Sequence, residues 1–437
     1  MSAPVARTFH SLGFGESARG RWLVPDRLRF LDALPGVPGI PRGAGLSLAG
    51  AGFGEDVLAL DMRRFDRILA FDPGAGTITV EAGITLGKLF RFLAPRGWQI
   101  AAQPGHPDIT VGGCIAGNVH GKNPLAHGCF GRWVLELDLI HPDHGRLVLS
   151  ADERADLLEL TIGGFGLTGV IATATILLQP MPGGRMRVEP VPVASLEAAV
   201  ETLIDRQGDA DQLYSWHDMA TSGRRGPGLV FHGRPLNGPR SALPLASYPA
   251  LNPELWALPV GVMNRPGIAV VNLAQSLRWR RPRELGAAEA AFPFARLPYY
   301  FYLYGRKGFL EHQTLVPWAA APAYLTSLRR LFDRHGVTPG LFVMKPFGGS
   351  PGLLRFEGEG LSVALEAAGG EQARTLFTEL DALDADHGGR ANLIKDARLP
   401  ARAVAAQYPG LDEFRRRLAA FDPRRRMRSS LSRRLEL

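Results

Sequence analysis

Two stretches of short apolar runs predict β-hairpins in the first half of the chain. Residues 67–71 and 77–81 flank a turn that contains proline and glycine, and residues 135–140 and 146–150 flank another. Runs of aliphatic, β-branched and aromatic residues that such a turn separates are typical of paired antiparallel strands. We therefore expect two hairpins in this region.

A helix and a further strand complete the pattern. Leucine and phenylalanine recur at helical spacing from residue 86 to residue 93, and the run stops at the Pro-Arg-Gly of residues 95–97. Residues 170–178 favour another strand, which Pro180 ends. Hairpins interleaved with single helices predict an α+β fold rather than a regularly alternating parallel sheet.

A segment rich in proline and glycine, residues 179–184, marks the predicted domain boundary. We expect a first domain over residues 1–183 and a second α+β domain over residues 184–389. Residues 223–283 are rich in proline and arginine and show no sustained period, which predicts a long mobile loop of the kind that often forms a lid.

Charge narrows the classes of partner. The chain has 437 residues, is 46% hydrophobic and carries a formal net charge of +8, which suggests nucleic acid, a membrane surface or an anionic ligand. The arginines are scattered, and neither zinc-finger spacing nor a basic aromatic repeat accompanies them. We therefore expect no nucleic-acid partner and at most a peripheral membrane contact.

The cysteines and the N-terminus bear on location. Cys114 and Cys129 are too few for a disulfide framework or a four-cysteine metal site, so we expect free thiols and no metal. The first residues lack the pattern of a signal peptide, and no apolar stretch approaches the roughly 18 residues that span a bilayer. These features predict a cytoplasmic protein.

Lysine is scarce. Of 50 basic residues five are lysine, namely Lys88, Lys122, Lys307, Lys345 and Lys395. A lysine ammonium is a compact charge whose pKa falls on burial, so it suits proton transfer better than an arginine does. Where arginine is the usual cation, a retained lysine is a candidate for chemistry, although chance retention explains any single one.

Glycine-rich stretches suggest a large ligand. Residues 164–169 match G-x-G-x-x-G, but they follow a helix-like segment and precede a strand, which is the reverse of a dinucleotide-binding fingerprint. Residues 41–47 allow successive backbone N–H groups to approach a pyrophosphate. Residues 104–123 are too apolar for a surface linker and too rich in glycine for a packed helix, so they suit contact with a flat ligand.

These stretches, with residues 162–171, resemble the PCMH-type FAD-binding domain of the vanillyl-alcohol-oxidase superfamily. Within that superfamily, residues 120–123, 395–398 and 433–437 are similar to the decaprenylphosphoryl-ribose 2-oxidases. The resemblance implies an FAD-binding domain over residues 1–183 that residues 390–437 complete, with residues 184–389 as a substrate (cap) domain. It also implies hydride transfer from a secondary hydroxyl of a sugar, or of a polyprenyl-phosphoryl sugar, to flavin N5.

The motif match assigns expected roles to individual residues. The expected catalytic residues are Lys395 and Lys122, and the expected substrate contacts are Trp216, Gln313, Lys345 and Ser362. The expected FAD contacts are Arg42, Gly43, Ala44, Gly45, Leu46, Ser47, Gly105, Thr110, Val111, Gly112, Gly113, Gly117, His120, Gly121, Ile171 and Asn392. His120, Trp216 and Lys345 each also have an ordinary alternative role, as a satisfied buried histidine, a core aromatic and a surface lysine.

Departures from the pattern leave the substrate open. Asn392 stands where the polyprenyl-sugar oxidases have tyrosine, Ser362 and Ala364 stand for an asparagine and a cysteine, and Glu311 replaces a glutamine. An alditol or aldonolactone oxidase of the same fold is an alternative, although its usual His-Trp-Gly-Lys motif is absent. A non-catalytic flavin- or anion-binding protein is another. The expected partners are a small or lipid-linked sugar and, from the resemblance, a short-chain reductase.

We predict that the FAD is bound without a covalent link. Leu46 lies where many relatives carry a flavin-linked histidine, and no cysteine stands beside Gly105. Acid precipitation of the purified protein should release all the flavin into the supernatant, which its absorbance measures. Yellow colour that persists in the washed pellet would show that another residue forms a bond to the flavin.

Overall fold

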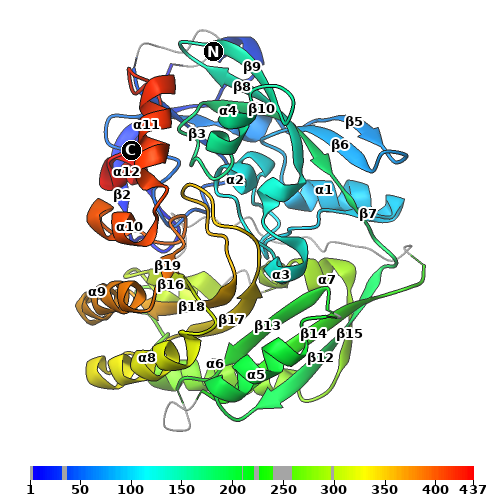
Figure 1. Ribbon diagram of the computed structural model, residues 1–437, viewed down its shortest axis with the longest axis vertical. Coiled ribbons are helices and arrows are strands. Elements are labelled where there is room, and N and C mark those ends of the chain that lie inside the picture. Colours follow the sequence, from blue (N-terminus) through cyan, green and yellow to red (C-terminus); the bar gives the residue numbers. More distant parts are fainter. Residues whose placement is uncertain (1–2, 32–36, 209, 221–225, 240–257, 297–299) are drawn as a thin grey trace.

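The computed structural model describes residues 3–31, 37–208, 210–220, 226–239, 258–296 and 300–437. Within these ranges the strands form sheets of four, five, two and eight strands. Figure 1 shows the four- and five-stranded sheets in the upper half of the molecule and the eight-stranded sheet, which we call the large sheet, in the lower half.

The five-stranded sheet contains both predicted hairpins. Its order is β5-β6-β10-β8-β9, with β5 (Ile68–Asp72), β6 (Thr77–Glu81), β10 (Val170–Leu177), β8 (Val134–His141) and β9 (Gly145–Ser150). β5 pairs antiparallel with β6, and β8 pairs antiparallel with β9, which confirms the prediction. The predicted helix is α1 (Leu86–Leu93), capped by Thr85, whose side chain accepts from the backbone N–H of Lys88.

Shorter elements complete the upper half. They are β1 (Val5–His10), β2 (Ser17–Leu23), β3 (Gly39–Arg42), β4 (Leu58–Asp61), β7 (Trp98–Gln99), β11 (Gln179–Pro180), α2 (Val111–Ala116), α3 (Pro124–His127), α4 (Ala155–Thr161), η1 (Leu28–Phe30), η2 (Met62–Arg64), η3 (Ala94–Arg96) and η4 (Phe130–Trp133). The G-x-G-x-x-G segment lies between α4 and β10, so it does follow a helix and precede a strand, as predicted.

The chain returns to the upper half at its C-terminal end. The helices α10 (Ala401–Gln407), α11 (Leu411–Phe421) and α12 (Ser430–Leu435) lie beside the N-terminal elements in Figure 1. One apolar cluster unites both chain ends, with Ile40 and Ala49 from the N-terminal side and Leu411, Phe414 and Leu435 from the C-terminal helices. The two ends therefore share a core.

The large sheet has the order β15-β12-β14-β13-β17-β18-β16-β19. Its strands are β12 (Arg185–Val193), β13 (Gln212–His217), β14 (Gly228–Leu236), β15 (Arg283–Gly286), β16 (Phe309–Val316), β17 (Leu341–Phe347), β18 (Gly360–Ala368) and β19 (Arg390–Ala391). The accompanying helices are α5 (Leu196–Asp205), α6 (Arg265–Arg278), α7 (Ala287–Ala291), α8 (Ala321–His335), α9 (Glu371–Asp386), η6 (Pro293–Arg296) and η7 (Tyr300–Tyr304).

Alternation along the strands gives the large sheet two different faces. Phe342 and Met344 of β17 pack in one apolar cluster with residues of α5, α8 and α9, which cover that face. The residues between and beside them, Leu341, Val343 and Lys345, line a cavity on the other face. Successive side chains of a strand point to opposite faces, so helices and cavity necessarily lie on opposite sides of the sheet.

Two expectations about secondary structure were wrong. The predicted irregular loop 223–283 contains β14, an inner strand of the large sheet, and the 14-residue helix α6, whereas residues 223–225 and 240–257 lie outside the described residues. Residues 229–233 of β14 are all buried, on both faces of the strand, so apolar and polar residues do not alternate there and the two-residue period of a strand is missing from the sequence. Apolar residues of α6 lie on its exposed side as well as its buried one, which hides the helical period.

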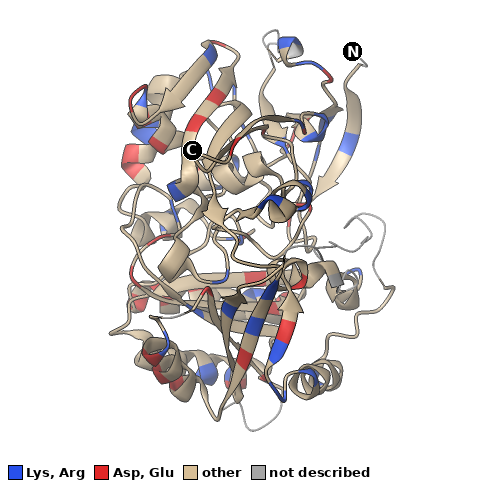
Figure 2. Cartoon of the chain, turned by 90° about the vertical axis from the view of Figure 1, so that its right-hand side faces the viewer, with Lys and Arg blue, Asp and Glu red and all other residues tan. Residues whose placement is uncertain are grey.

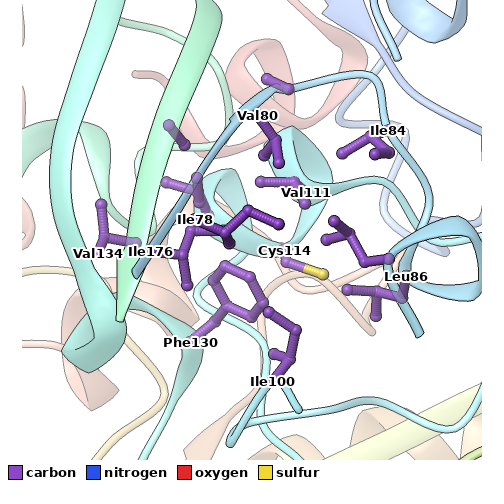
Figure 3. Packing of buried hydrophobic residues seen from close by; sticks show 14 of the residues in the cluster. Ile78, Val80, Ile84, Leu86, Ile100, Val111, Cys114, Phe130, Val134 and Ile176 are labelled. Atoms are coloured by element: carbon purple, nitrogen blue, oxygen red, sulfur yellow. The ribbon is translucent and has the colours of Figure 1, made fainter. Parts of the chain in front are cut away.

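The second correction concerns residues 104–123, which contain the short helix α2 despite their glycines. The Thr110 side chain caps α2 by accepting from the backbone N–H of Gly113 at 3.2 Å. Val111 and Cys114 point into the core between β6, β10 and α1, as Figure 3 shows. Both cysteines are free, as expected, and both are buried.

Candidate active site

A cavity of about 1040 Å³ lies between the glycine-rich loops of the upper half and the open face of the large sheet. This volume is at the upper end of the roughly 300–1,000 Å³ that small-molecule sites occupy, so it suits a large cofactor together with a substrate. Residues 41–53 and 104–122 form one wall, and strands β13, β16, β17 and β18 form the opposite wall. Segment 392–395, just before the C-terminal helices, also reaches the cavity.

The glycine-rich wall has room for a ligand because side chains are missing there. A Cβ on Gly43 would lie 2.2 Å from Thr110 Oγ1, so the loops 41–47 and 104–117 are in close contact. Gly45 has φ of +75°, which favours glycine, and its missing Cβ leaves space for the Arg42 guanidinium. Arg42 in turn lies over the rings of Phe9 and Phe53, at 5.2 Å and 5.6 Å from their centroids.

The structure places nearly all of the expected FAD contacts on the cavity wall. These residues are Arg42, Gly43, Ala44, Gly45, Leu46, Ser47, Gly105, Thr110, Gly112, Gly113, Gly117, His120, Gly121, Ile171 and Asn392. Val111 is the exception, because its side chain is fully buried in the core instead. Its backbone N–H is also used within the fold, where it donates to the carbonyl of Ile84 at 2.9 Å.

A hydrogen-bonded chain connects the glycine-rich wall with the large sheet. Asn392 Nδ2 donates to Gln313 Oε1 at 2.9 Å, and Gln313 Nε2 lies 2.9 Å from His120 Nε2 and 3.1 Å from Ser362 Oγ. His120 Nδ1 lies 3.0 Å from the carbonyl of Gly121. His120 therefore donates through Nδ1 and accepts through Nε2, which requires the neutral ring.

The pKa of His120 also indicates a neutral ring. Burial, followed by the charge of Lys345, lowers the pKa of His120 to about 3. The hydrogen bonds to Gly121 and Gln313 act in the opposite direction but are weaker.

Ser362 does not line the cavity itself but orients Gln313, which corrects its expected place as a substrate contact. Trp216, Gln313 and Lys345 do line the cavity.

Three of the five lysines meet at the cavity, namely Lys122, Lys345 and Lys395. Lys122 Nζ donates to the carbonyls of Ala290 and Ala291, the latter at 3.1 Å. Burial, followed by the charge of Lys345, lowers the pKa of Lys122 to about 7. An amine with such a pKa can hold or release a proton near neutral pH.

The other two lysines have different acceptors. Lys345 Nζ lies 3.4 Å from the carbonyl of Gly121, and burial, followed by the charge of Lys395, lowers the pKa of Lys345 to about 8. Lys395 Nζ forms a salt bridge with Glu311 Oε1 at 3.0 Å. Figure 2 shows Lys and Arg interspersed with Asp and Glu over the strands and helices of the chain.

The part of the cavity next to β13 and β14 is apolar. Trp216 and Phe231 belong to an apolar cluster with Trp279 and Leu285, and all four also line the cavity. The ring of Tyr214 is tilted by 31° against that of Phe231, with ring centroids 5.0 Å apart. The cavity is therefore lined by three lysines and by this aromatic cluster from β13 and β14, which we call its aromatic end. Lys122 borders the aromatic end, because it donates to the carbonyl of Ala290 in the same cluster.

Several cavity residues escaped the sequence analysis. Glu366, Tyr300 and Gln212 line the cavity but had no expected role there. Gln212 lies two and four residues before Tyr214 and Trp216, and Glu366 lies four residues after Ser362, so the two-residue period of a strand would have found both. Tyr300 lies in η7, where no such period exists.

The sequence matches known proteins along most of its length. Residues 28–150 match the family model described as an FAD binding domain. The chain is 34% identical over 377 residues, 81% of this chain and 100% of the relative, to an uncharacterized protein from the 5′ region of mprA in Streptomyces coelicolor. The chain belongs to the family of PCMH-type FAD-binding oxidoreductases.

Two further relatives have named activities. This flavoprotein is 28% identical over 411 residues to decaprenylphosphoryl-beta-D-ribose oxidase of Mycolicibacterium smegmatis, which covers 91% of this chain and 89% of the relative. It is 31% identical over 125 residues to L-gulonolactone oxidase of Mus musculus, which covers 29% of this chain and 28% of the relative. Within the described residues, no helix is both long and apolar enough to cross a bilayer.

FAD is the cofactor of this family, and the residues present fit it. Gly43, Gly45, Gly112 and Gly113 line the wall that Arg42 and Thr110 border and place no side chain in its space. The N–H groups of Gly112 and Gly113 donate to the Ala82 carbonyl and to Thr110 Oγ1. The loop 41–47 is therefore the part of this wall whose backbone suits a pyrophosphate, and an arginine adds a matching charge. Leu46 and Gly105 line the same wall and offer no nucleophile, in keeping with the predicted absence of a covalent link.

A test of this wall replaces Gly113 with valine. A Cβ at Gly113 would meet only Thr110 Oγ1, at 3.2 Å, among the described atoms within 4 Å, so the larger side chain has room in the fold but fills space in the cavity. We expect Gly113→Val to lower the affinity for FAD at least about tenfold, or ~1.4 kcal/mol. The ratio of flavin to protein absorbance after dialysis measures it, with Gly286→Ala as a control because no neighbour lies within 4 Å of that position. Equal FAD content in both variants would place the cofactor elsewhere.

Burial of Lys122 predicts a pH-dependent stability. The pKa of Lys122 is lowered from 10.5 to about 7 in the folded protein, so between these values unfolding takes up a proton. The free energy of unfolding of the wild type therefore rises with pH through this window, by up to about 1.4 kcal/mol per pH unit from this group. Lys122→Met lacks this contribution. Between about pH 7.5 and about pH 9.5, the free energy of unfolding from denaturant titrations should therefore increase more for the wild type than for the variant. A constant difference would mean that Lys122 keeps its solution pKa.

Proposed function

We propose that this flavoprotein oxidises a secondary hydroxyl of a sugar, most specifically of a polyprenyl-phosphoryl sugar, to a ketone. The observation that carries the proposal is the meeting of Lys122, Lys345 and Lys395 at one cavity that the glycine-rich wall also borders. The likeness to decaprenylphosphoryl-beta-D-ribose oxidase, which extends over 91% of this chain, supports it. The aromatic end of the cavity suits the apolar part of a lipid-linked substrate.

Bound FAD supplies the oxidising power, because a flavin accepts a hydride from a carbon atom. The chain supplies binding, orientation and charge. Lysine ammonium groups in a site with little water stabilise the negative charge that develops on a substrate oxygen as its proton leaves. Burial lowers the pKa of both Lys122 and Lys345, and their ammonium groups are held against backbone carbonyls of Ala290, Ala291 and Gly121.

Proton handling follows from the lowered pKa values. Near neutral pH, a fraction of Lys122 is the free amine, whose lone pair can accept the hydroxyl proton. His120 is unsuited to this step, because its Nε2 already accepts from Gln313 and its pKa is lowered to about 3. Gln313 and Asn392 instead fix the position of the imidazole beside the cavity.

A substrate panel tests the proposal. The purified holoprotein is mixed without oxygen with a polyprenyl-phosphoryl pentose, a free hexitol and an aldonolactone, and the loss of flavin absorbance is followed. We expect the polyprenyl-phosphoryl sugar to reduce the flavin fastest. Reduction by the lactone alone would instead favour the activity named for the mouse relative, and no reduction by any sugar would favour a non-catalytic flavoprotein.

Lys395 provides a sharper test of the lysine cluster. Lys395→Met removes an ammonium from the cavity without adding bulk, and we expect bound FAD to be retained while flavin reduction slows at least about a hundredfold. Lys88→Met is the matched control, because Lys88 is a half-exposed lysine on α1 that pairs with Asp66 away from the cavity. Stopped-flow absorbance measures both. Similar rates in the two variants would remove Lys395 from the chemistry.

A further inference from the structure

Two acidic residues lie side by side on the cavity face of the large sheet. β16 and β18 pair antiparallel with Glu311 directly opposite Glu366. Both side chains line the cavity although their residues are only 9% and 3% exposed. Like charges directly opposite each other on a ladder are destabilising, so such a pair needs compensating partners.

The partners of the two carboxyl groups differ. Glu311 binds the Lys395 ammonium through both oxygens, at 3.0 Å from Oε1 and 3.1 Å from Oε2. Glu366 Oε2 instead accepts from the hydroxyls of Tyr300 and Tyr304, at 2.9 Å and 3.1 Å. Burial, followed by the charge of Glu311, raises the pKa of Glu366 to about 7. Glu311 is therefore the member of the pair that faces an ammonium group, whereas Glu366 faces two hydroxyls.

This pairing changes the charge that a substrate meets. Lys122 and Lys345 donate to backbone carbonyls, which carry no net negative charge to balance an ammonium group. Lys395 is matched by a carboxylate, and its side chain is 39% exposed, so it still faces the cavity. Beside Lys395 the substrate therefore meets an ion pair rather than a bare cation.

We propose that Glu311 is a specificity-determining residue, whose carboxylate makes the Lys395 end of the cavity accept an uncharged hydroxyl and reject a substrate that carries a carboxylate there. A hydroxyl can donate to Glu311 or accept from Lys395, whereas a substrate carboxylate beside Glu311 meets a like charge. Recognition by an unfavourable contact of this kind is a common source of specificity. The inference rests on the proposed function for the site, since it concerns the group that lies next to Lys395.

The test compares two ligands of equal length, D-glucitol and D-gluconate, which differ by a terminal CH₂OH or carboxylate. Their dissociation constants are measured by calorimetry with the holoprotein of wild type, Glu311→Gln and Glu311→Asp. Glutamine keeps the shape of Glu311 without the charge, and aspartate keeps the charge. FAD content and thermal unfolding establish that each variant is folded.

We expect the wild type to prefer glucitol, and Glu311→Gln to shift the ratio of the two dissociation constants at least about tenfold toward gluconate, since it frees the Lys395 ammonium. Glu311→Asp should retain most of the wild-type preference. An unchanged ratio in Glu311→Gln, or an equal shift in Glu311→Asp, would overturn the proposal. Flavin reduction by the polyprenyl-phosphoryl pentose is recorded separately, so its absence counts against the proposed function, while the binding ratio of glucitol and gluconate still tests Glu311.

A second measurement decides the matter if neither ligand binds. Glu311 raises the pKa of Lys345, which burial and Lys395 lower to about 8. With only five lysines in the chain, ¹³C-methylated lysine signals can be assigned through single Lys→Met variants. In Glu311→Gln the pKa of Lys345 should fall further, while the signal of the surface residue Lys88 stays unchanged. A Lys345 pKa that does not fall would show that Glu311 does not set the charge of this end of the cavity.

Discussion

The gathering of three ammonium groups along one cavity, of which Lys122 and Lys345 are withdrawn from solvent and Lys395 is partly exposed, is the constraint on which the rest of the site depends. Each buried cation needs an acceptor, because taking a charge out of water is costly unless it is paired. The acceptors are the carbonyls at α7 for Lys122, the carbonyl of Gly121 for Lys345 and the carboxylate of Glu311 for Lys395. These acceptors come from three separate segments, so the site exists only when the upper loops, the large sheet and segment 392–395 are assembled together.

The fold meets this requirement through a division of the large sheet into two faces. One face is covered by α5, α8 and α9 and contributes only to the core, whereas the other presents polar and aromatic residues to the cavity. Opposite it, short side chains let the loops 41–47 and 104–117 approach each other, and both chain ends share one core behind them. Cofactor wall and substrate wall are thus built by parts of the chain that are far apart in sequence, yet Gln313 and Asn392 join them through hydrogen bonds.

Local features of this architecture could be predicted from the sequence, and long-range ones could not. The hairpins β5–β6 and β8–β9 and the helix α1 follow from period and turn residues within a few positions. Expectations failed where burial on two sides removed the period, as in β14, or where a cap made a glycine-rich segment helical, as in α2. Motif matching selected lysines that the structure places at the cavity, but a motif does not give the direction of a side chain: that of Val111 lies in the core, and that of Ser362 accepts from Gln313. The strand period could have placed Glu366 at the cavity, but its hydrogen bond with Tyr300 joins residues 66 positions apart, which no local pattern encodes.

The chemistry proposed for this cavity requires that a C–H bond of the substrate alcohol breaks as the bound flavin is reduced. The most direct measurement is the rate of anaerobic flavin bleaching by a polyprenyl-phosphoryl pentose that carries deuterium on the carbinol carbon, compared with the unlabelled compound. We predict that both compounds bleach the flavin and that the deuterated one does so several-fold more slowly. Absence of bleaching with either compound would contradict the proposal that this protein oxidises a sugar hydroxyl, and equal bleaching rates would contradict rate-limiting hydride transfer from that carbon.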